Sequence, residues 1–245
     1  MSDTRPDPEP ETWSEADHIT RARARLVEAA LQHVMFDGWT PITFRAAIAD
    51  SGVDPGLAHQ AAPRGAVDLA IAFHKQGDAA MIAAMEAADL GAMRYSERVA
   101  FGVRARLEAV TGHREAVRRG ATLFSLPQNL GEGTTLIWGT ADAIWKALGD
   151  TSDDLNWYTK RMTLSGVYSS TLLFWLGDDS DGFADTWAFL DRRIDDVMQI
   201  EKMKSKMREN PLGRVLMAGP EFLFRTVRAP KADAREDLPG YTGSR

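Results

Sequence analysis

The stretch ITFRAAIADSGVDPGLAHQAAPRGAVDL, residues 42–69, sets the expectation for the fold. It predicts a short helix over residues 43–50, a turn at Gly52, and a second short helix over residues 55–62. A longer amphipathic helix is predicted within residues 18–37, where apolar residues recur at helical spacing. Two short helices joined by a turn behind a longer helix form a helix-turn-helix outline.

The chain beyond this outline continues in helical patterns to about residue 208. The alternation of apolar and polar residues that is typical of strands is absent. Further helices are predicted over residues 64–90, 96–113, 114–126, 133–149, 153–176 and 181–208. The sequence therefore predicts an all-α protein in which short turns join one helix to the next.

The turn GDDSDGF, residues 177–183, has the acidic character of a cation-binding loop. The EF-hand spacing fails, however. Counted from Asp178, the sixth position is Phe183 where the motif needs glycine, and the twelfth is Phe189 where it needs glutamate. We expect Asp179 and Asp181 to cap a helix that starts near Gly182, where carboxylates favour the positive end of the helix dipole. The sequence therefore predicts no metal site here.

The composition bounds the functional classes. The net charge of the 245 residues is −6, so the whole chain has no general attraction for a nucleic-acid backbone. The absence of cysteine excludes disulfides, thiolate zinc sites and cysteine nucleophiles. No uncharged apolar run reaches the length of a spanning helix. Phosphate-loop, nucleophile-elbow and dinucleotide motifs are also absent, so we predict neither an enzyme nor a bound cofactor.

Aromatic side chains and small residues are interleaved through the later helices. One interpretation is ordinary packing, because small residues let helices approach each other. The other is a long cavity for an apolar ligand, with aromatic walls and a floor of small residues. The candidate lipid-binding residues, chosen by helical spacing, are Phe124, Trp138, Trp145, Tyr168, Leu172 and Trp175.

The stretch WYTKRMTLSGVYSSTLLFW, residues 157–175, is the most aromatic part of these helices. The uncharged run that follows Arg161 is too short and too rich in hydroxyl groups to span a bilayer. One continuous helical stripe is predicted from residues at alternating four- and three-residue spacing, which are Trp157, Arg161, Leu164, Tyr168, Thr171 and Trp175. We expect its later two-thirds to face a ligand-lined core and its first turn, with Trp157 and Tyr158, to meet solvent.

The segment from 209 to 228 combines apolar residues with scattered arginines. An interfacial membrane segment needs both, because anionic head groups attract the cations while phenylalanine and leucine enter the apolar layer. The alternative is a segment docked on its own domain. The candidate membrane residues are Leu216, Phe222, Leu223, Phe224 and Arg225.

The predicted organisation has five parts. Charge and proline content predict disorder for the acidic start, and the last residues are predicted to be disordered as well. The parts are a disordered acidic N-terminus (1–17), a degenerate helix-turn-helix region (18–75), a lipid-binding helical domain (76–208), an amphipathic segment (209–228) and a disordered tail (229–245).

The helix-turn-helix stretch resembles the N-terminal domain of TetR-type regulators. The residues in register with that family are Gly52, Val53, Gly56 and Pro63. In the family, a tyrosine and a lysine after the second helix bind phosphates, whereas this chain has His59 and Gly65 at those positions. The resemblance therefore implies a scaffold that no longer binds nucleic acid. The alternative is a TetR-type, ligand-responsive transcriptional regulator.

The segment from Asn156 to Lys204 resembles the ubiquinone-biosynthesis lipid-binding accessory proteins, the ninth Coq protein of the usual naming. Together with the TetR-like part, this resemblance covers residues 18–205. It implies a non-catalytic homodimer of TetR-like fold that binds an isoprenoid lipid, a quinone intermediate or a phospholipid. It also implies that quinone intermediates are presented to a ubiquinone-pathway hydroxylase at the membrane surface.

The family's NWYTRR motif falls on residues 156–161, which implies that Trp157, Tyr158 and Arg161 are partner-binding residues. The first arginine of the motif is Lys160 here, which keeps the charge and loses the planar fork. The alanine- and arginine-rich composition resembles a bacterial member. The expected location is therefore the bacterial cytoplasm, peripheral at the inner face of the membrane.

Overall fold

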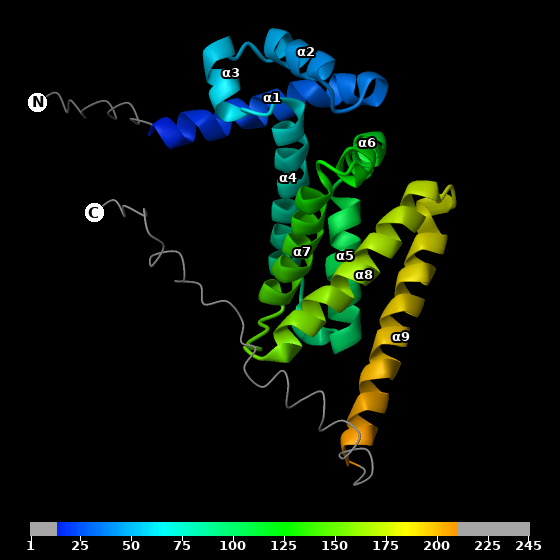
Figure 1. The fold of residues 1–245 in the computed structure, drawn as a ribbon. Helices are drawn as coiled ribbons and strands as arrows, with labels where there is room; N and C mark the ends of the chain where they lie inside the picture. Colours follow the sequence, from blue (N-terminus) through cyan, green and yellow to red (C-terminus); the bar gives the residue numbers. More distant parts are fainter. Residues whose placement is uncertain (1–13, 210–245) are drawn as a thin grey trace, which may run out of the picture. The chain divides into compact units, whose positions relative to one another are not determined.

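A computed structural model describes residues 14–209 of the chain (Figure 1). All regular elements in this range are helices, and the predicted all-α class is confirmed. The described residues form two compact units. The first contains the residues up to 76 and the segment 112–130, and the second contains the segment 77–111 and the described residues from 131 onward.

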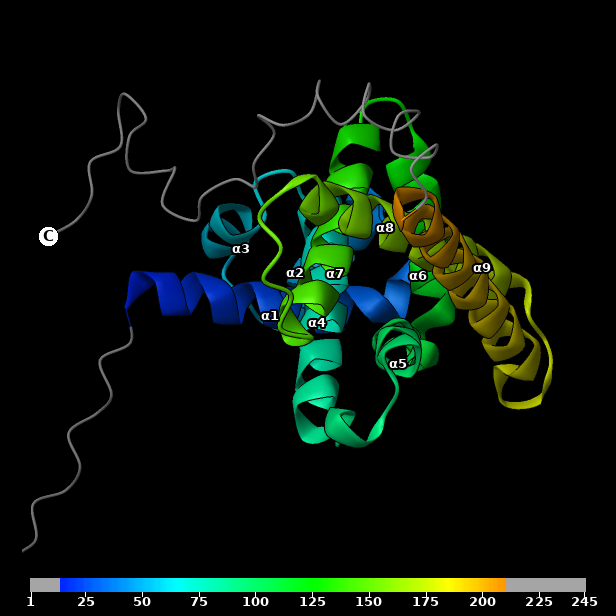
Figure 2. The same cartoon turned by 90° about the horizontal axis from the view of Figure 1, so that it is seen from below.

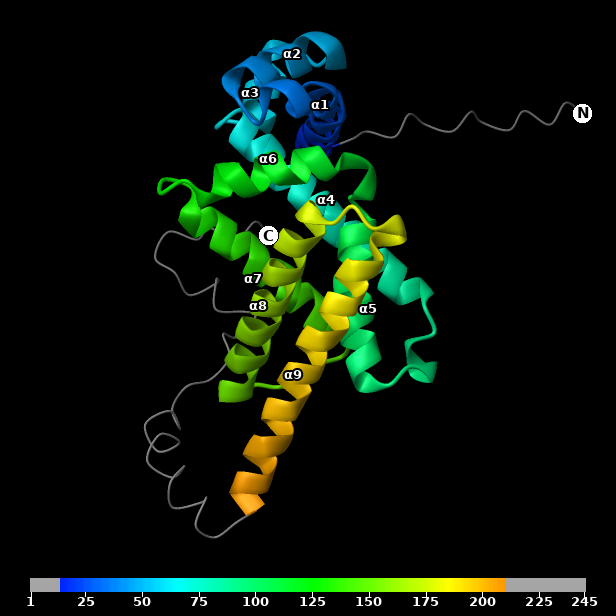
Figure 3. The same cartoon turned by 90° about the vertical axis from the view of Figure 1, so that its right-hand side faces the viewer.

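The first unit carries the helix-turn-helix. Its elements are α1 (Glu15–Asp37), α2 (Pro41–Ser51), α3 (Pro55–Ala61), the first half of α4 (Ala66–Ala87), all but the first residue of η2 (Thr111–His113), and α6 (Arg114–Ser125). Helix α1 packs against α2 and α3 (Figures 1 and 3). Gly52 ends α2 with a φ of 63°, a left-handed conformation that glycine adopts without strain. The indole N–H of Trp39 donates to the carbonyl oxygen of Ala116 at 3.0 Å and ties α6 to this unit.

The second unit carries the later helices. Its elements are the second half of α4, η1 (Leu90–Ala92), α5 (Tyr95–Glu108), α7 (Leu130–Ala147), α8 (Leu155–Gly177), η3 (Asp181–Phe183) and α9 (Ala184–Glu209). Helices α8 and α9 run side by side after a tight turn (Figure 3). Helix α9 also contacts α5, which is seen along its axis in Figure 2.

The core of the second unit contains an ion pair among its apolar side chains. The Nε of Arg106 lies 2.6 Å from Oδ1 of Asp78, and the Thr140 hydroxyl donates to the same oxygen at 2.8 Å. A Cβ atom at Gly77 would lie 2.5 Å from the guanidinium, so glycine is what admits Arg106 at this point. The burial of Arg106 therefore depends on its pairing with the Asp78 carboxylate and on the absence of a side chain at Gly77.

The turn between α8 and α9 is held by Asp178, which is buried. Its Oδ1 accepts from the Ser180 backbone N–H at 2.8 Å, and its Oδ2 accepts from the Thr186 backbone N–H at 2.9 Å. The expected capping by Asp179 and Asp181 near Gly182 is thus corrected, because α9 starts at Ala184 and Asp178 reaches its first turn. These hydrogen bonds from Ser180 and Thr186 hold the pKa of Asp178 well below its usual range.

The replacement Asp178→Asn is expected to destabilise the protein at pH 7, with a deficit that shrinks at acid pH. A lowered folded-state pKa means that the carboxylate stabilises the fold above the unfolded-state pKa of about 3.9. That contribution is lost as the pH falls toward the folded-state pKa. Urea denaturation followed by circular dichroism at pH 7 and pH 3 measures it. Asp153→Asn, at an exposed loop position, is the control, and a deficit of equal size at both pH values would contradict the expectation.

Candidate functional site

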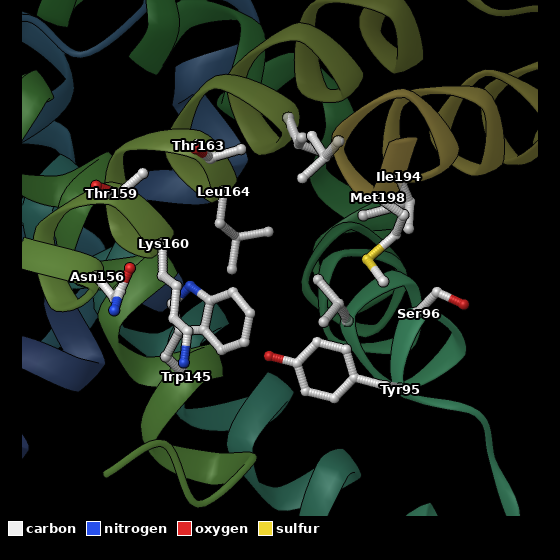
Figure 4. A pocket seen from close by; sticks show the side chains of 13 residues that line it. Tyr95, Ser96, Trp145, Asn156, Thr159, Lys160, Thr163, Leu164, Ile194 and Met198 are labelled. Carbon is white, nitrogen blue, oxygen red and sulfur yellow. The ribbon is translucent and has the colours of Figure 1, made fainter. Parts of the chain in front are cut away.

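A pocket of about 230 Å³ lies between α5, α7, α8 and α9 of the second unit (Figure 4). Helix α8 contributes Asn156, Thr159, Lys160, Thr163, Leu164 and Val167. The other helices contribute Tyr95, Ser96 and Val99 from α5, Trp145 from α7, and Ile194, Val197 and Met198 from α9. The α8 residues follow each other at spacings of three and one, so a single face of this helix lines the pocket.

The lining changes character along α8. Asn156 and Lys160 near the helix start are polar, whereas Leu164 and Val167 one or two turns later are apolar. Helix α9 contributes apolar side chains only. A pocket with a polar end and an apolar end suits an amphipathic ligand.

Tyr95, Trp145 and Lys160 lie near one another at the polar end. The rings of Tyr95 and Trp145 have centroids 6.1 Å apart, and Nζ of Lys160 lies 5.5 Å from the Trp145 ring centroid. Figure 4 shows the Tyr95 hydroxyl directed toward Trp145 and Lys160. Burial raises the pKa of the Tyr95 phenol, an effect that the charge of Lys160 opposes and that of Asp150 reinforces. The phenol therefore stays protonated at neutral pH and can donate a hydrogen bond.

A network of ion pairs supports this end of the pocket. Nζ of Lys160 donates to Oδ1 of Asp150 at 2.6 Å, and Nη1 of Arg161 lies 3.1 Å from Oδ2 of the same carboxylate. Nε of Arg161 lies 2.6 Å from Oδ1 of Asp142. Burial disfavours ionisation of Asp150, but hydrogen bonds from Lys160, Ser152 and Arg161 outweigh it and hold its pKa below the usual range. Asp150 is therefore a carboxylate at neutral pH.

An aromatic cluster of Trp138, Trp157 and Tyr158 lies against the same network. Trp157 and Tyr158 meet edge to face with centroids 4.7 Å apart, and Trp138 lies 5.9 Å from Trp157. The Arg161 guanidinium is 4.1 Å from the Trp157 ring centroid, at a distance typical of a cation–π contact. Arg161 is 1 % exposed. It therefore packs against the buried side of the Trp157 ring and is not accessible to a partner. Trp157 and Tyr158 are half-buried and accessible.

The six predicted lipid-binding residues are dispersed in the structure. Trp145 lines the pocket. Tyr168 and Trp175 are fully buried in the core of the second unit, and Trp138 belongs to the aromatic cluster. Leu172 is half-buried on α8, and Phe124 is half-buried on α6 in the first unit.

Sequence reasoning missed most of the pocket lining. The missed positions on α8 are spaced i, i+3, i+4 and i+7 from Asn156, a signal that the sequence does contain. The contribution of α5, at Tyr95 and Val99, has no comparable signal, because spacing within one helix does not reveal which neighbour it faces. The predicted membrane residues Leu216, Phe222, Leu223, Phe224 and Arg225 lie outside the described residues.

None of the helices in residues 14–209 combines the length and apolar composition that crossing a bilayer requires. Within the part of the chain that the structure describes, the acidic and histidine side chains form no group suited to a metal ion.

The helix-turn-helix has little to offer a phosphate backbone. Helix α3, PGLAHQA, contains neither lysine nor arginine. A ring nitrogen of His59 lies 2.7 Å from the Pro55 carbonyl oxygen, and its ring packs edge-on against Phe44 with centroids 5.5 Å apart. The Nε of Arg23 donates to the Ala61 carbonyl oxygen at 2.6 Å. These side chains hold the motif together from within.

Comparison with known structures defines the class of protein. The TetR transcriptional regulator from Nitrosomonas europaea aligns with a TM-score of 0.60 over 71 % of this chain and 96 % of that chain. The sequences are 19 % identical, so this likeness shows the fold alone. The chain is therefore an all-α protein of TetR-like fold, as predicted, with an amphipathic pocket in its second unit.

Sequence comparison finds similarity to one family. Residues 130–201 match the COQ9 family model. The ubiquinone biosynthesis protein COQ9 of Drosophila melanogaster is 31 % identical over 80 % of this chain and 61 % of its own length. The rat protein is 32 % identical over 80 % and 64 %, and the human protein 29 % over 80 % and 63 %. The predicted resemblance to the COQ9 family is confirmed, and the chain spans about three fifths of the length of these relatives.

The expected location is contradicted by the same relatives. The fly, rat and human proteins are all named as mitochondrial, in conflict with a bacterial cytoplasm. The expectation rested on an alanine- and arginine-rich composition, which is not a targeting signal and carries no information about compartment.

Proposed function

We propose that this protein acts in ubiquinone biosynthesis, the process for which its COQ9 relatives are named, as a non-catalytic lipid-binding accessory protein. It binds an isoprenoid lipid, a quinone intermediate or a phospholipid in the pocket described above. It presents the bound intermediate to a pathway hydroxylase at a membrane surface. The observation that carries the proposal is the amphipathic pocket, three of whose four helices fall in or overlap the segment that matches the COQ9 family.

The physical basis is the insolubility of a polyprenyl tail. Each CH₂ group removed from water is worth about 0.8 kcal/mol, so a long tail does not diffuse freely between a membrane and an enzyme. The pocket volume of about 230 Å³ is below the range of most small-molecule sites. It therefore suits a head group and the first part of a tail, while the rest of the tail stays in the membrane.

Organic extraction of the purified full-length chain, followed by mass spectrometry, tests the proposal. We expect isoprenoid, quinone or phospholipid to be recovered in stoichiometric amounts, because a pocket with apolar walls retains such ligands through purification. A protein that yields no lipid and also fails to bind liposomes would count decisively against a lipid-binding function.

The partner surface in this proposal is the cluster of Trp138, Trp157 and Tyr158. Accessible aromatic side chains are the commonest anchors of protein interfaces. We expect Tyr158→Ala to weaken binding of the hydroxylase by at least about tenfold, with an unchanged unfolding temperature. Ile42→Ala, at an exposed apolar position of the first unit, is the matched control. Biolayer interferometry with immobilised hydroxylase measures both, and equal weakening by the two variants would argue for another surface.

A homodimer is part of the same proposal. Phe174 of α8 and Phe189 of α9 stack with centroids 4.6 Å apart, and the neighbouring Leu173 is exposed. Exposed apolar side chains gathered in one place support association with a second copy. Membrane docking is proposed for residues 209–228 from their sequence, since residues 210–228 lie outside the described residues. The absence of lysine and arginine from α3 supports the further proposal that nucleic acid is not a partner.

A further inference from the structure

A continuous series of contacts runs from the pocket to the accessible aromatic cluster. Lys160 lines the pocket, and its Nζ donates to Oδ1 of Asp150 at 2.6 Å. The other oxygen of that carboxylate, Oδ2, lies 3.1 Å from Nη1 of Arg161. Nη1 of Arg161 also donates to the Trp157 carbonyl oxygen at 3.1 Å, and the guanidinium lies 4.1 Å from the Trp157 ring centroid. Trp157 in turn meets Tyr158 with ring centroids 4.7 Å apart.

The series begins at a partly hydrated group and passes through buried ones. The side chain of Lys160 is 34 % exposed, whereas those of Asp150 and Arg161 are 5 % and 1 % exposed. The buried pair is held in one geometry, because breaking it would leave an uncompensated charge in a poorly hydrated place. At Lys160, water competes with the carboxylate for the ammonium and weakens the pair. Lys160 is therefore the member of the series that can respond to what fills the pocket.

A molecule in the pocket excludes water from the Lys160 side chain, which lies among the pocket residues (Figure 4). Attraction between charges strengthens where water is removed, so the ammonium is held more firmly by Asp150 and by the Ser152 hydroxyl, 2.8 Å away. A fixed Asp150 holds Arg161 in place, and Arg161 holds Trp157. An aromatic side chain that is already held in place loses less conformational freedom when a partner binds it.

We propose that occupancy of the pocket raises the affinity of this chain for the pathway hydroxylase, and that Lys160 and Asp150 are the positioning residues that couple the two sites. The loaded protein then binds its partner more tightly than the empty one. Thermodynamic linkage requires that the partner raise the affinity of the pocket by the same factor. This inference rests on the proposed function, because it needs both the pocket and the partner surface.

Biolayer interferometry of the full-length chain on immobilised hydroxylase, with and without saturating geranylated benzoquinone as the probe, tests the inference. The coupling is the ratio of the two dissociation constants, and we expect the probe to tighten partner binding by about fivefold or more. Asp150→Asn and Lys160→Met are each expected to abolish this effect, since each breaks the series at a different contact. Lys160→Arg keeps a cation beside Asp150 and should retain most of it.

Lys146→Met is the matched control, because it removes an exposed cation that lies outside the series, and it should keep the native coupling. Thr163→Trp, which places an indole in the pocket lining, shows whether the probe acts through this chain. We expect no effect of the probe on that variant. An undiminished effect would mean that the probe acts on the hydroxylase itself, and would overturn the inference.

Unfolding temperatures establish that each variant is folded, and Lys160→Met decides the matter if Asp150→Asn is not. Equal coupling in the native chain and in Lys160→Met would overturn the role of these residues. A native chain that binds both probe and hydroxylase, but binds the hydroxylase equally well with and without the probe, would overturn the coupling and leave the proposed function intact. Failure of the native chain to bind the probe in a calorimetric titration would overturn both together.

Discussion

Replacement of Arg161 by methionine is expected to lower the free energy of unfolding by about 3 kcal/mol and the unfolding temperature by about 6–12 °C. Arg161 is 1 % exposed and binds two carboxylates, those of Asp142 and Asp150. Methionine fills much of its volume but leaves both carboxylates short of a partner in a poorly hydrated place. This loss of unfolding free energy lies at the low end of the range for broken buried ion pairs. The reason is that Asp142 keeps its contact with Lys146 and Asp150 keeps its contact with Lys160.

Lys146→Met is the matched control for this prediction. Lys146 contacts the same Asp142, with Nζ 2.7 Å from Oδ2, but its side chain is 72 % exposed. Exposed pairs contribute between zero and about 1 kcal/mol, so this variant should be close to the native chain in stability. Thermal unfolding followed by circular dichroism compares the two. Similar losses for Arg161→Met and Lys146→Met would show that burial does not govern the strength of this network.

The same network joins the pocket to the proposed partner surface. Asp150 holds Lys160, which lines the pocket, and Arg161, which lies beneath Trp157. The residues 156–161, on which the NWYTRR motif falls, therefore differ in their structural roles. Trp157 and Tyr158 are accessible, Arg161 holds Trp157 in place, and Lys160 faces the pocket.

Helical periodicity was sufficient to predict the helices themselves. The segment predicted over residues 153–176 is α8, Leu155–Gly177, and the segment predicted over 133–149 is α7, Leu130–Ala147. Apolar residues recur on one face of these segments every three or four residues, which is a local property of the chain. The predicted stripe on α8 is also buried from Arg161 to Trp175.

The pocket could not be predicted in the same way. Most of the buried stripe of α8 packs in the core, whereas the pocket lies against the adjacent face, which begins at Asn156 and ends at Val167. Only Leu164 belongs to both sets. Both faces contain apolar residues, and the choice between them depends on how α5 and α9 pack, which is a tertiary property. The aromatic residues Tyr168 and Trp175 were chosen by helical spacing, but large apolar side chains are more often used to fill a core than to line a cavity.

The second large effect is expected from Thr163→Trp, which places an indole in the pocket. Thr163 lies on the pocket face of α8, between the polar residues near Asn156 and the apolar pair that starts at Leu164. An indole occupies a substantial part of a cavity of about 230 Å³, so bound lipid and indole compete for the same space. We expect at least a tenfold loss of affinity for a short-chain prenylated benzoquinone, about 1.4 kcal/mol or more in binding free energy.

Met162→Trp is the matched control, because it introduces the same side chain at the neighbouring position, which is 66 % exposed and outside the pocket lining. It should bind the benzoquinone as the native chain does, and calorimetric titration of both variants measures the difference. Thr163→Val, which changes shape little, keeps the comparison informative if Thr163→Trp is unstable. Equal affinities of a folded Thr163→Trp and of Met162→Trp would mean that the ligand binds elsewhere, since a filled pocket cannot hold both the indole and a quinone.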